Sequence, residues 1–363
     1  MPGDSIFSKF ILKLLEKLFS VQENKSLELK PPQKIIIVRY HNNLYDLLTG
    51  ISLFRAIKET YPDSHISLVI KKLNYPGKLK IKFIDEIYVF RVIKLFNPFY
   101  LIKTLKFFKE SYDVAIVPVV AAVSHASNFI ARVCNAETRI GINMINGIKN
   151  DSNFLFDRRV NVDWRIHPDS NVSERSLDIL RPFGINTTDY RSEINFDEDD
   201  LKTADKFLSG FREKKDSIIG LHIGAAKQQC RWSIIKFCSL LNKLNENYSI
   251  NVYLAGSNAD INEINFVKKN IKFSFEILIS KTVSEIAAVV SKSDLFISND
   301  SEIMHIAGST STPQISIFGF TNPFNWAPVG ANKYFIRKSE LIDDIAVDDV
   351  YHLCELILQK KED

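Results

Sequence analysis

The chain has 363 residues, 45% of them hydrophobic and 25% charged, so it is long enough for two domains that each bury a core. Its net charge of +4 is modest and does not favour a nucleic-acid-binding protein. The four cysteines lack metal-ligand spacing, which argues against a zinc site or a disulfide framework and favours a reducing cytoplasm. No apolar run reaches transmembrane length, and lysines interrupt the N-terminal apolar stretch that a signal peptide would need.

The first predicted element is an amphipathic helix over residues 5–20. Apolar side chains recur there at helical spacing, and three lysines stand four residues apart. A basic amphipathic helix can lie in a membrane interface, but it can equally pack on the protein's own body, which we favour slightly. A polar linker follows, so residues 1–33 are predicted to be a helix and a linker outside the domains.

The next part of the chain alternates apolar strands with helices, as the βαβ units of a parallel sheet do. Residues 34–38 form a continuous apolar run, as expected of a central strand, and a helix is predicted over residues 46–60. We assign residues 34–210 to this first Rossmann-like domain. Its other predicted elements are strands at 66–70 and 114–119, a helix at 124–134 and a helix that ends at Gly184.

Residues 71–109 of this domain are basic and aromatic. They contain ten Lys or Arg residues against only two carboxylates, interleaved with aromatic side chains such as Phe96 and Phe99. Such a segment could meet an anionic ligand or a membrane surface. A solvated face with ordinary core aromatics is an alternative of equal weight.

A second βα series predicts another Rossmann-like domain over residues 211–335. The C-terminal segment 336–363 contains a predicted helix at 347–360, which could pack back on the first domain. Two such domains facing a central cleft would make an α/β protein. The predicted elements of the second series are strands at 218–222, 251–255, 275–279 and 294–298, and helices at 233–246, 259–270 and 283–292.

Residues 298–328 carry the most informative pattern. The apolar strand before them leads through a polar turn to a helix that begins at Met304, and another strand follows. A helix N-terminus therefore lies just beyond a buried strand, where α/β proteins hold phosphates. His305 could donate to such a phosphate, although a lone histidine on an apolar helix face is usually a core residue. The pattern predicts a nucleotide-diphosphate site.

Asp46 stands at the start of the helix that follows the first strand. A carboxylate in that place could take a proton from an acceptor hydroxyl. Aspartate is also favoured as an N-cap at such helix starts, and without further information this is the more frequent case.

The loop after strand 218–222 contains small residues and cations. Gly224 and Ala225 would let a diphosphate approach the backbone, and Lys227 and Arg231 could neutralise it. The loop is neither a P-loop nor a GxGxxG motif, and a plain strand–loop–helix junction remains an equal alternative.

Two further residues follow strands of the second domain. Asp260 could accept a hydrogen bond from a ribose hydroxyl, although a helix cap is the commoner role. Lys281 is expected at the same edge of the sheet. Thr282 with Glu285 would form a capping box for the next helix.

Taken together, these segments resemble glycosyltransferase family nine, whose best-known members are ADP-heptose:lipopolysaccharide heptosyltransferases. The resemblance spans about residues 34–335. The late motif of the family appears as DSEIMHIA from Asp300, TP from Thr312 and FGFTNP from Phe318, followed by Trp326 and Pro328. Four earlier elements appear as RYHNNLYD from Arg39, RIG from Arg139, HIGA from His222 and CRW from Cys230.

The resemblance implies a GT-B fold with an N-terminal acceptor domain, a C-terminal nucleotide-sugar domain, and inverting chemistry without a metal or cofactor. It makes Asp46 the catalytic base and puts Arg39, His41 and Asn43 on the acceptor side. Helix N–H groups and cations would stabilise the leaving group. The implied donor-binding residues are Gly224, Ala225, Lys227, Arg231, Asp260, Lys281, Asp300, Ser301, Glu302 and His305.

Three positions depart from the family pattern. Where the family has a glycine before the catalytic base, this chain has Tyr45. Where the family has a glycine at the phosphate turn, this chain has Glu302, whose charge would repel a diphosphate. Where the family has the lysine of its K-x-W motif, this chain has Cys230. Arg231 or Lys227 could supply the positive charge of the missing lysine.

We therefore expect a cytoplasmic glycosyltransferase, peripheral on the inner membrane, that moves a heptose from ADP-heptose onto a lipopolysaccharide-core or related surface glycan. The basic segment 71–109 would receive the anionic acceptor. One alternative is an enzyme with a different nucleotide sugar. The other is a non-catalytic homologue that binds a glycan or partner.

Overall fold

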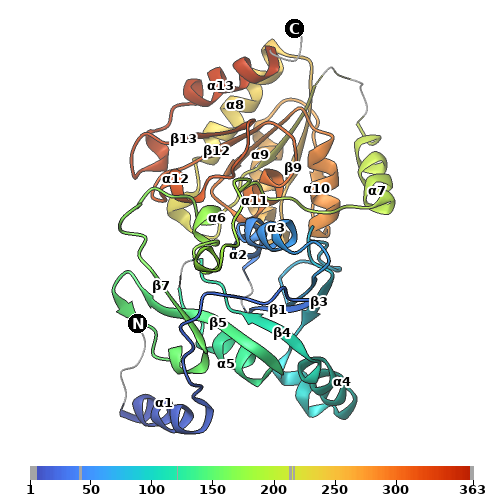
Figure 1. Cartoon of the computed structure of the whole chain (residues 1–363). Helices are drawn as coiled ribbons and strands as arrows, with labels where there is room; N and C mark the ends of the chain where they lie inside the picture. Colours follow the sequence, from blue (N-terminus) through green and yellow to red (C-terminus); the bar gives the residue numbers. More distant parts are fainter. Residues whose placement is uncertain (1–5, 41–42, 121, 212–214, 216, 360–363) are drawn as a thin grey trace. The chain divides into compact units, whose positions relative to one another are not determined.

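The structure, a computed structural model, describes residues 6–40, 43–120, 122–211, 215 and 217–359 (Figure 1). The chain divides into two compact units. Unit 1 comprises Met1–Asn74 and Phe83–Tyr190, and unit 2 comprises Tyr75–Lys82 and Arg191–Asp363. Each unit has its own sheet with helices against it, so the predicted pair of α/β domains is confirmed.

The sheet of unit 1 has the order β3-β2-β1-β4-β5-β6, with β7 also paired to β5. All of its pairs are parallel except that of β5 with β6. The central strand β1 is buried along almost its whole length, as its apolar sequence requires. The strands are β1 (Lys34–Arg39), β2 (His65–Ile70), β3 (Glu86–Val89), β4 (Tyr112–Ile116), β5 (Ala136–Ile145), β6 (Ile148–Lys149) and β7 (Arg158–Val162).

Helices α4 and α5 bury apolar side chains against this sheet. The core on one side gathers aromatic and aliphatic side chains from β1, β3, α4 and α5. The helical elements are α1 (Ile6–Phe19), α2 (Leu44–Leu48), α3 (Ile51–Thr60), η1 (Val92–Phe96), α4 (Pro98–Lys109), α5 (His125–Val133), η2 (Asn153–Leu155), α6 (Val172–Arg175) and η3 (Arg181–Phe183).

The C-terminal end of α1 is attached to unit 1. The ring of Phe19 packs edge-on against Phe129 with centroids 5.2 Å apart, and Arg132 Nε donates to the Phe19 carbonyl at 2.8 Å. The next turn of chain continues the attachment, since Val21 N donates to the Phe154 carbonyl at 3.0 Å. This end therefore packs on the protein's own body, which is the arrangement that the sequence favoured.

The sheet of unit 2 is parallel throughout, in the order β10-β9-β8-β11-β12-β13. Its strands are β8 (Ser217–His222), β9 (Ile250–Ala255), β10 (Glu276–Leu278), β11 (Leu295–Asn299), β12 (Gln314–Ile317) and β13 (Lys333–Ile336). Its helical elements are α7 (Glu198–Leu208), η4 (Gln228–Cys230), α8 (Ile234–Asn247), η5 (Asn258–Asp260), α9 (Ile261–Asn270), α10 (Val283–Ser291), α11 (Glu302–Gly308), α12 (Pro323–Trp326), η6 (Ile342–Asp344) and α13 (Val347–Gln359).

The units differ from the predicted domain boundaries. The change of unit comes after Tyr190 rather than at 210, because α7 packs on unit 2, where Phe207 meets Tyr253 edge-on at 5.7 Å. The C-terminal helix α13 does not belong to unit 1. It contributes Cys354 and Leu358 to the core of unit 2, since its apolar face completes that core beside α8.

Some predicted elements also differ in extent. The helix predicted over 46–60 is two helices, α2 and α3, separated at Thr49 and Gly50. The helix predicted to end at Gly184 is reduced to α6 and η3, although Gly184 does end η3 in the left-handed conformation. No helix among the described residues is long and apolar enough to cross a membrane.

Candidate functional site

The C-terminal ends of β8, β9, β10 and β11 lie at one edge of the unit 2 sheet, because these strands run parallel. Each strand passes from buried apolar residues into a loop that starts the next helix. Ligands of open α/β sheets bind at this edge. All of the predicted donor-binding residues lie in the loops and helix starts along it.

The start of α11 is built by Asp300 and Ser301. Ser301 is the N-cap, and its Oγ accepts a hydrogen bond from Met304 N at 3.2 Å. The helix therefore begins at Glu302, two residues before the predicted Met304. Its first turn presents backbone N–H groups at the end of β11, as the sequence predicted for an anion site.

Cys230, which replaces the family lysine, lies against Asp300. Its Sγ is 3.9 Å from Asp300 Oδ2 and 3.8 Å from Thr321 Oγ1. Burial raises the pKa of Asp300, while Thr321 and the nearby Lys227 act to lower it. Lys227 is therefore a cation within electrostatic range of this carboxylate.

Arg231 has a structural role at this edge. Its Nε donates to the Ala225 carbonyl at 2.8 Å, and its Nη1 pairs with Glu263 at 2.7 Å. Of the two cations that could substitute for the missing lysine, Lys227 is thus better placed than Arg231, whose charge is already balanced.

Gly224 is required for a close approach to Asp260. A Cβ at Gly224 would overlap the Asp260 carboxylate. That carboxylate accepts from Ser257 N at 2.7 Å and from Ser257 Oγ at 2.9 Å, closing a capping box at η5. Asp260 thus has the cap role that the sequence left as the commoner alternative, and it still lies at the edge of the sheet.

The start of α10 confirms the predicted capping box. Thr282 Oγ1 accepts from Glu285 N at 3.1 Å, and Glu285 accepts from Thr282 N at 2.7 Å. Lys281 pairs loosely with the same glutamate at 3.9 Å.

His305 is buried within α11, with only 5% of its surface exposed. Burial lowers its pKa to about 4, so the imidazole is neutral at neutral pH. A neutral imidazole can donate a hydrogen bond to a phosphate, but it adds no positive charge.

Tyr75 is a residue at this edge that the sequence reasoning missed. Burial and the charges of Glu302 and Asp260 raise the pKa of its phenol, which is therefore neutral at neutral pH. The only sequence signal was the Tyr-Pro-Gly turn, since Glu302 lies more than two hundred residues away.

In unit 1, Asp46 lies within electrostatic range of the buried guanidinium of Arg39, and 8% and 3% of their surfaces are exposed. Burial lowers the pKa of Arg39 to about 10, and the Asp46 charge counteracts this. A Cβ at Gly50 would overlap that guanidinium, which explains the glycine between α2 and α3. Asp46 is not the N-cap, because Asn43 takes that position.

Of the other two predicted acceptor-side residues, the structure describes Asn43 but not His41. Asn43 Nδ2 donates to the Tyr45 hydroxyl at 3.2 Å, so Tyr45 fills space near the start of α2. His41 lies outside the described residues. Within the described ranges, no three His, Cys, Asp or Glu side chains gather to hold a metal ion.

Solved structures share this architecture. A glycosyl transferase of family 9 from Veillonella parvula superposes with a TM-score of 0.77 at 18% identity, over 92% of this chain and 100% of that one. ADP-heptose LPS heptosyltransferase II of E. coli does so with a TM-score of 0.74 at 16% identity, over 91% and 100%. The two Rossmann-like units thus show the GT-B fold.

Sequence comparison gives the family. Residues 100–345 match the model of glycosyltransferase family 9 (heptosyltransferase), and the chain belongs to this family of enzymes. Lipopolysaccharide heptosyltransferase 3 of Escherichia coli is 23% identical over 311 residues, which are 81% of this chain and 85% of that protein. Lipopolysaccharide core heptosyltransferase OpsX of Haemophilus influenzae is 28% identical over 149 residues, 40% and 41% of the two chains.

Proposed function

We propose that this glycosyltransferase moves a heptose from ADP-heptose onto a lipopolysaccharide-core or related cell-surface glycan, with inversion and without a metal. The observation that carries the proposal is the assembly of Asp300, Ser301 and His305 at the start of α11, directly after a buried parallel strand. Lipopolysaccharide heptosyltransferase 3 and lipopolysaccharide core heptosyltransferase OpsX act, by their names, on lipopolysaccharide, and one solved relative is E. coli heptosyltransferase WaaC with ADP.

The donor diphosphate would bind at the start of α11. The first-turn N–H groups and the helix dipole favour an anion there. Lys227 would supply the cation that Cys230 does not, and His305 would donate a neutral hydrogen bond. ADP is the favoured nucleotide because two solved structures of WaaC hold ADP or ADP-2-deoxy-2-fluoro heptose.

The acceptor hydroxyl would lose its proton to Asp46. The hydroxyl oxygen forms a bond to the anomeric carbon as the bond from that carbon to the diphosphate oxygen breaks, which inverts the configuration. The proton goes to the Asp46 carboxylate, and the negative charge leaves with ADP. Arg39 balances the charge of Asp46 in its buried surroundings, and α11 and Lys227 stabilise the leaving group.

A transfer assay tests the proposal. Purified protein would be given ADP-heptose, UDP-glucose or GDP-mannose with a lipopolysaccharide-core oligosaccharide, with and without a chelator, and the new linkage would be assigned by NMR. We expect transfer from ADP-heptose, inverted configuration and no effect of the chelator. Transfer from another donor would support the different-sugar alternative. Absence of all transfer, with the glycan still bound, would support the non-catalytic one.

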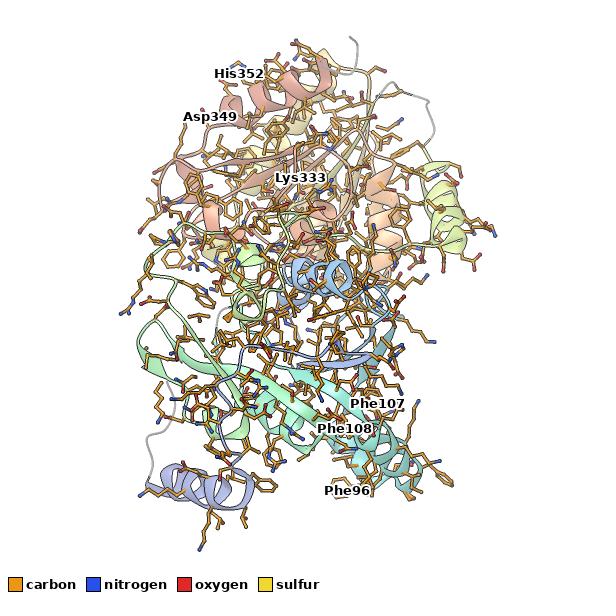
Figure 2. All side chains as sticks on the ribbon, in the orientation of Figure 1. Phe96, Phe107, Phe108, Lys333, Asp349 and His352 are labelled. Carbon is orange, nitrogen blue, oxygen red and sulfur yellow. The ribbon has the colours of Figure 1, made fainter. Side chains whose placement is uncertain are left out.

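We further propose that the enzyme works at the cytoplasmic face of the inner membrane, held there by η1 and α4. Phe107 and Phe108 fix α4 on the sheet, and Phe107 stacks on Tyr88 at 4.3 Å (Figure 2). The outer face keeps large apolar side chains in solvent, with Phe96 89% and Phe99 83% exposed. Exposed apolar groups of this size mark an interaction surface.

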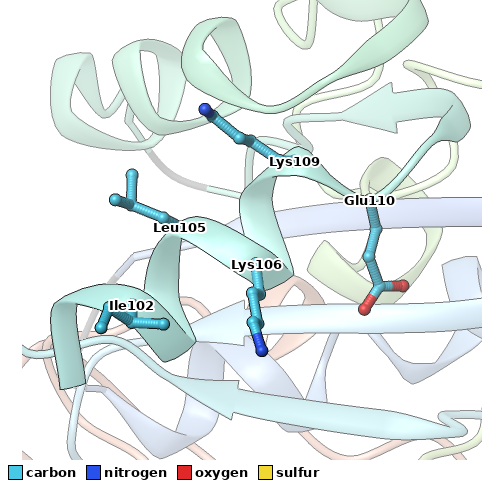
Figure 3. A pocket seen from close by; sticks show the side chains of 5 residues that line it. All are labelled: Ile102, Leu105, Lys106, Lys109 and Glu110. Carbon is cyan, nitrogen blue, oxygen red and sulfur yellow. The ribbon is translucent and has the colours of Figure 1, made fainter. Parts of the chain in front are cut away.

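The charge of this face suits an anionic lipid surface. Residues 91–109 contain five cations and no carboxylate. Lys106 and Lys109 line a surface pocket of α4 together with Ile102 and Leu105 (Figure 3). Apolar side chains flanked by lysines are typical of proteins that insert into the headgroup region. The four cysteines, all free and buried, suit the reducing cytoplasmic side.

Vesicle sedimentation tests this attachment. The double variant Phe96→Ser/Phe99→Ser should lose binding to phosphatidylethanolamine–phosphatidylglycerol vesicles, and each of Lys103→Gln and Lys106→Gln should weaken it about fivefold. The matched control is Phe320→Ser/Phe324→Ser, two exposed aromatics of unit 2. Equal vesicle binding by native protein and the Phe96/Phe99 variant would rule the attachment out.

A further inference from the structure

A cavity of about 530 Å³ lies in unit 1, where the chain leaves β7. Its wall is formed by side chains of one continuous segment, from Asp163 to Arg181, which includes α6. The volume is that of an ordinary small-molecule pocket. The proposed donor residues belong to unit 2, so this cavity is a different site.

A stacked pair of side chains forms part of the wall. The guanidinium carbon of Arg175 lies 5.3 Å from the centroid of the Trp164 ring. The indole is itself held in place, because Trp164 Nε1 donates to Asp178 at 2.9 Å and Arg181 pairs with the same carboxylate. Only 8% of Trp164 is exposed, so a ligand would meet the guanidinium rather than the indole.

The guanidinium of Arg175 is fixed by the loop that precedes α6. Its Nε donates to Ser170 Oγ at 2.9 Å, and its Nη2 donates to the Pro168 carbonyl at 2.7 Å. Its Nη1 has no hydrogen-bond acceptor among the residues that the structure describes. Arg175 therefore presents a donor to the cavity in an orientation that is set before any ligand arrives.

The charge of the wall favours a neutral ligand. Four carboxylates and two guanidinium groups line the cavity, so a phosphate would be repelled. Sugar hydroxyls can donate to carboxylates and accept from a guanidinium. Ile166, 69% exposed, adds an apolar surface for the C–H face of a sugar ring. The cavity therefore differs from the face of residues 91–109, which contains five cations and suits anions.

The cavity and Asp46 lie at the same edge of the unit 1 sheet. Strands β1, β4, β5 and β7 are successive parallel neighbours, so their C-terminal ends share one edge. Asp46 follows β1 and the cavity follows β7, three strand spacings or about 14 Å away across the sheet. The backbone of α6 is tied to α3, the helix after Asp46, because Ser52 Oγ donates to the Ser173 carbonyl at 2.5 Å.

We propose that this cavity is a subsite for a neutral sugar of the acceptor glycan, remote from the hydroxyl that reacts. This inference rests on the proposed function. Hydroxyls of that sugar would accept from Arg175 Nη1 and donate to the carboxylates of the wall, with a ring face on Ile166. A glycan held there keeps its reacting hydroxyl at a high effective concentration near Asp46. The enzyme should therefore prefer a long acceptor to a short one that carries the same hydroxyl.

Direct binding tests the subsite without the donor. Arg175→Lys keeps the charge and removes the planar fork, and Ile166→Ala shortens an exposed side chain. Calorimetry with dephosphorylated lipopolysaccharide-core oligosaccharide should show binding about tenfold weaker for Arg175→Lys, as expected for one lost charge-assisted hydrogen bond, and a smaller loss for Ile166→Ala. The matched controls are Arg165→Lys and Ile148→Ala, exposed positions of unit 1 outside the cavity, which should bind as the native chain does.

The transfer assay gives the second readout. Arg175→Lys should raise KM for the long oligosaccharide about tenfold and leave kcat, and KM for a truncated acceptor, unchanged. Native affinity and KM in both cavity variants would overturn the subsite while the transferase stands. No binding of the dephosphorylated probe by the native chain would overturn it too. Weakened binding in the variants, with no transfer from any donor, would support the subsite and count against the proposed activity.

Discussion

Two short helices, α2 in unit 1 and α11 in unit 2, each carry a carboxylate in the first turn after a buried parallel strand. Their neighbours differ. Asp46 of α2 lies within electrostatic range of the cationic guanidinium of Arg39, whereas Glu302 of α11 lies within electrostatic range of the neutral phenol of Tyr75. The same local geometry therefore serves different chemistry. A carboxylate near a cation is suited to accept a proton, whereas a carboxylate in the first turn of an anion-binding helix disfavours a diphosphate.

The largest expected effect is on the Asp46 side of this comparison. Asp46→Asn keeps the shape and removes the base, so kcat should fall by about 10²–10⁴-fold. ADP binding should be unchanged, because Asp46 belongs to unit 1 and the proposed nucleotide site to unit 2. ADP release and calorimetry measure the two quantities, with the exposed Asp63→Asn as control. Activity close to that of the native enzyme would show that Asp46 is not the base.

Gly50→Ala breaks the same site without touching a charge. The added Cβ would displace the Arg39 guanidinium from its position near Asp46. Adding atoms to a well-packed core costs about 1–3 kcal/mol, and the displaced guanidinium would no longer act on Asp46, so the melting temperature and the activity should both fall. The double variant Arg39→Met/Gly50→Ala should regain stability because the overlap is gone, but not activity. Native stability in Gly50→Ala would contradict the close packing of Arg39.

On the α11 side, removing the carboxylate should help rather than harm. Glu302→Gly eliminates a like charge near the diphosphate and should tighten ADP binding about tenfold, as expected for one repulsive pair in a partly shielded site. The exposed Glu340→Gly is the control for net charge. Weaker binding in Glu302→Gly would mean that the carboxylate is itself a ligand of the donor, and the contrast with Asp46 would disappear.

The smallest expected effect concerns pH and His305. Its pKa is lowered from 6.5 to about 4 in the folded chain, so between these values the unfolded state binds more protons. The contribution of His305 to the free energy of unfolding should therefore be fully present above pH 6.5. It should fall by about 3 kcal/mol as the pH falls toward 4. His305→Gln should show a flatter profile in urea melts between pH 4 and 6.5. Parallel profiles would contradict the burial of the imidazole.

The sequence predicted the parallel strands well where they are continuous apolar runs, as in β1 and β11. It missed β5, whose sequence mixes charged and apolar residues, and β13, which is only four residues long. It also joined α2 and α3 into one helix, because nothing local indicates that Gly50 makes room for Arg39. Packing that arises from distant residues decided each of these cases.

In the candidate site, too, the sequence predicted the local features and missed those that depend on distant residues. Asp300, Ser301 and His305 are local to one motif, and the structure places them together at α11 as expected. The substitute for the missing lysine could not be chosen from the sequence, since the pairing of Arg231 with Glu263 depends on α9. Tyr75 was missed because Glu302, whose charge acts on its phenol, comes from the other half of the chain. The sequence therefore supplies the motif, and long-range contacts supply its electrostatic surroundings.

The most direct test of the central claim is calorimetric titration of the purified native chain with ADP, UDP, GDP and CDP, with Glu302→Gly in parallel. The account predicts that ADP binds the native chain, that the other three bind at least about tenfold more weakly, and that Glu302→Gly tightens ADP. Failure of all four nucleotides to bind either form would contradict a nucleoside-diphosphate site at the start of α11.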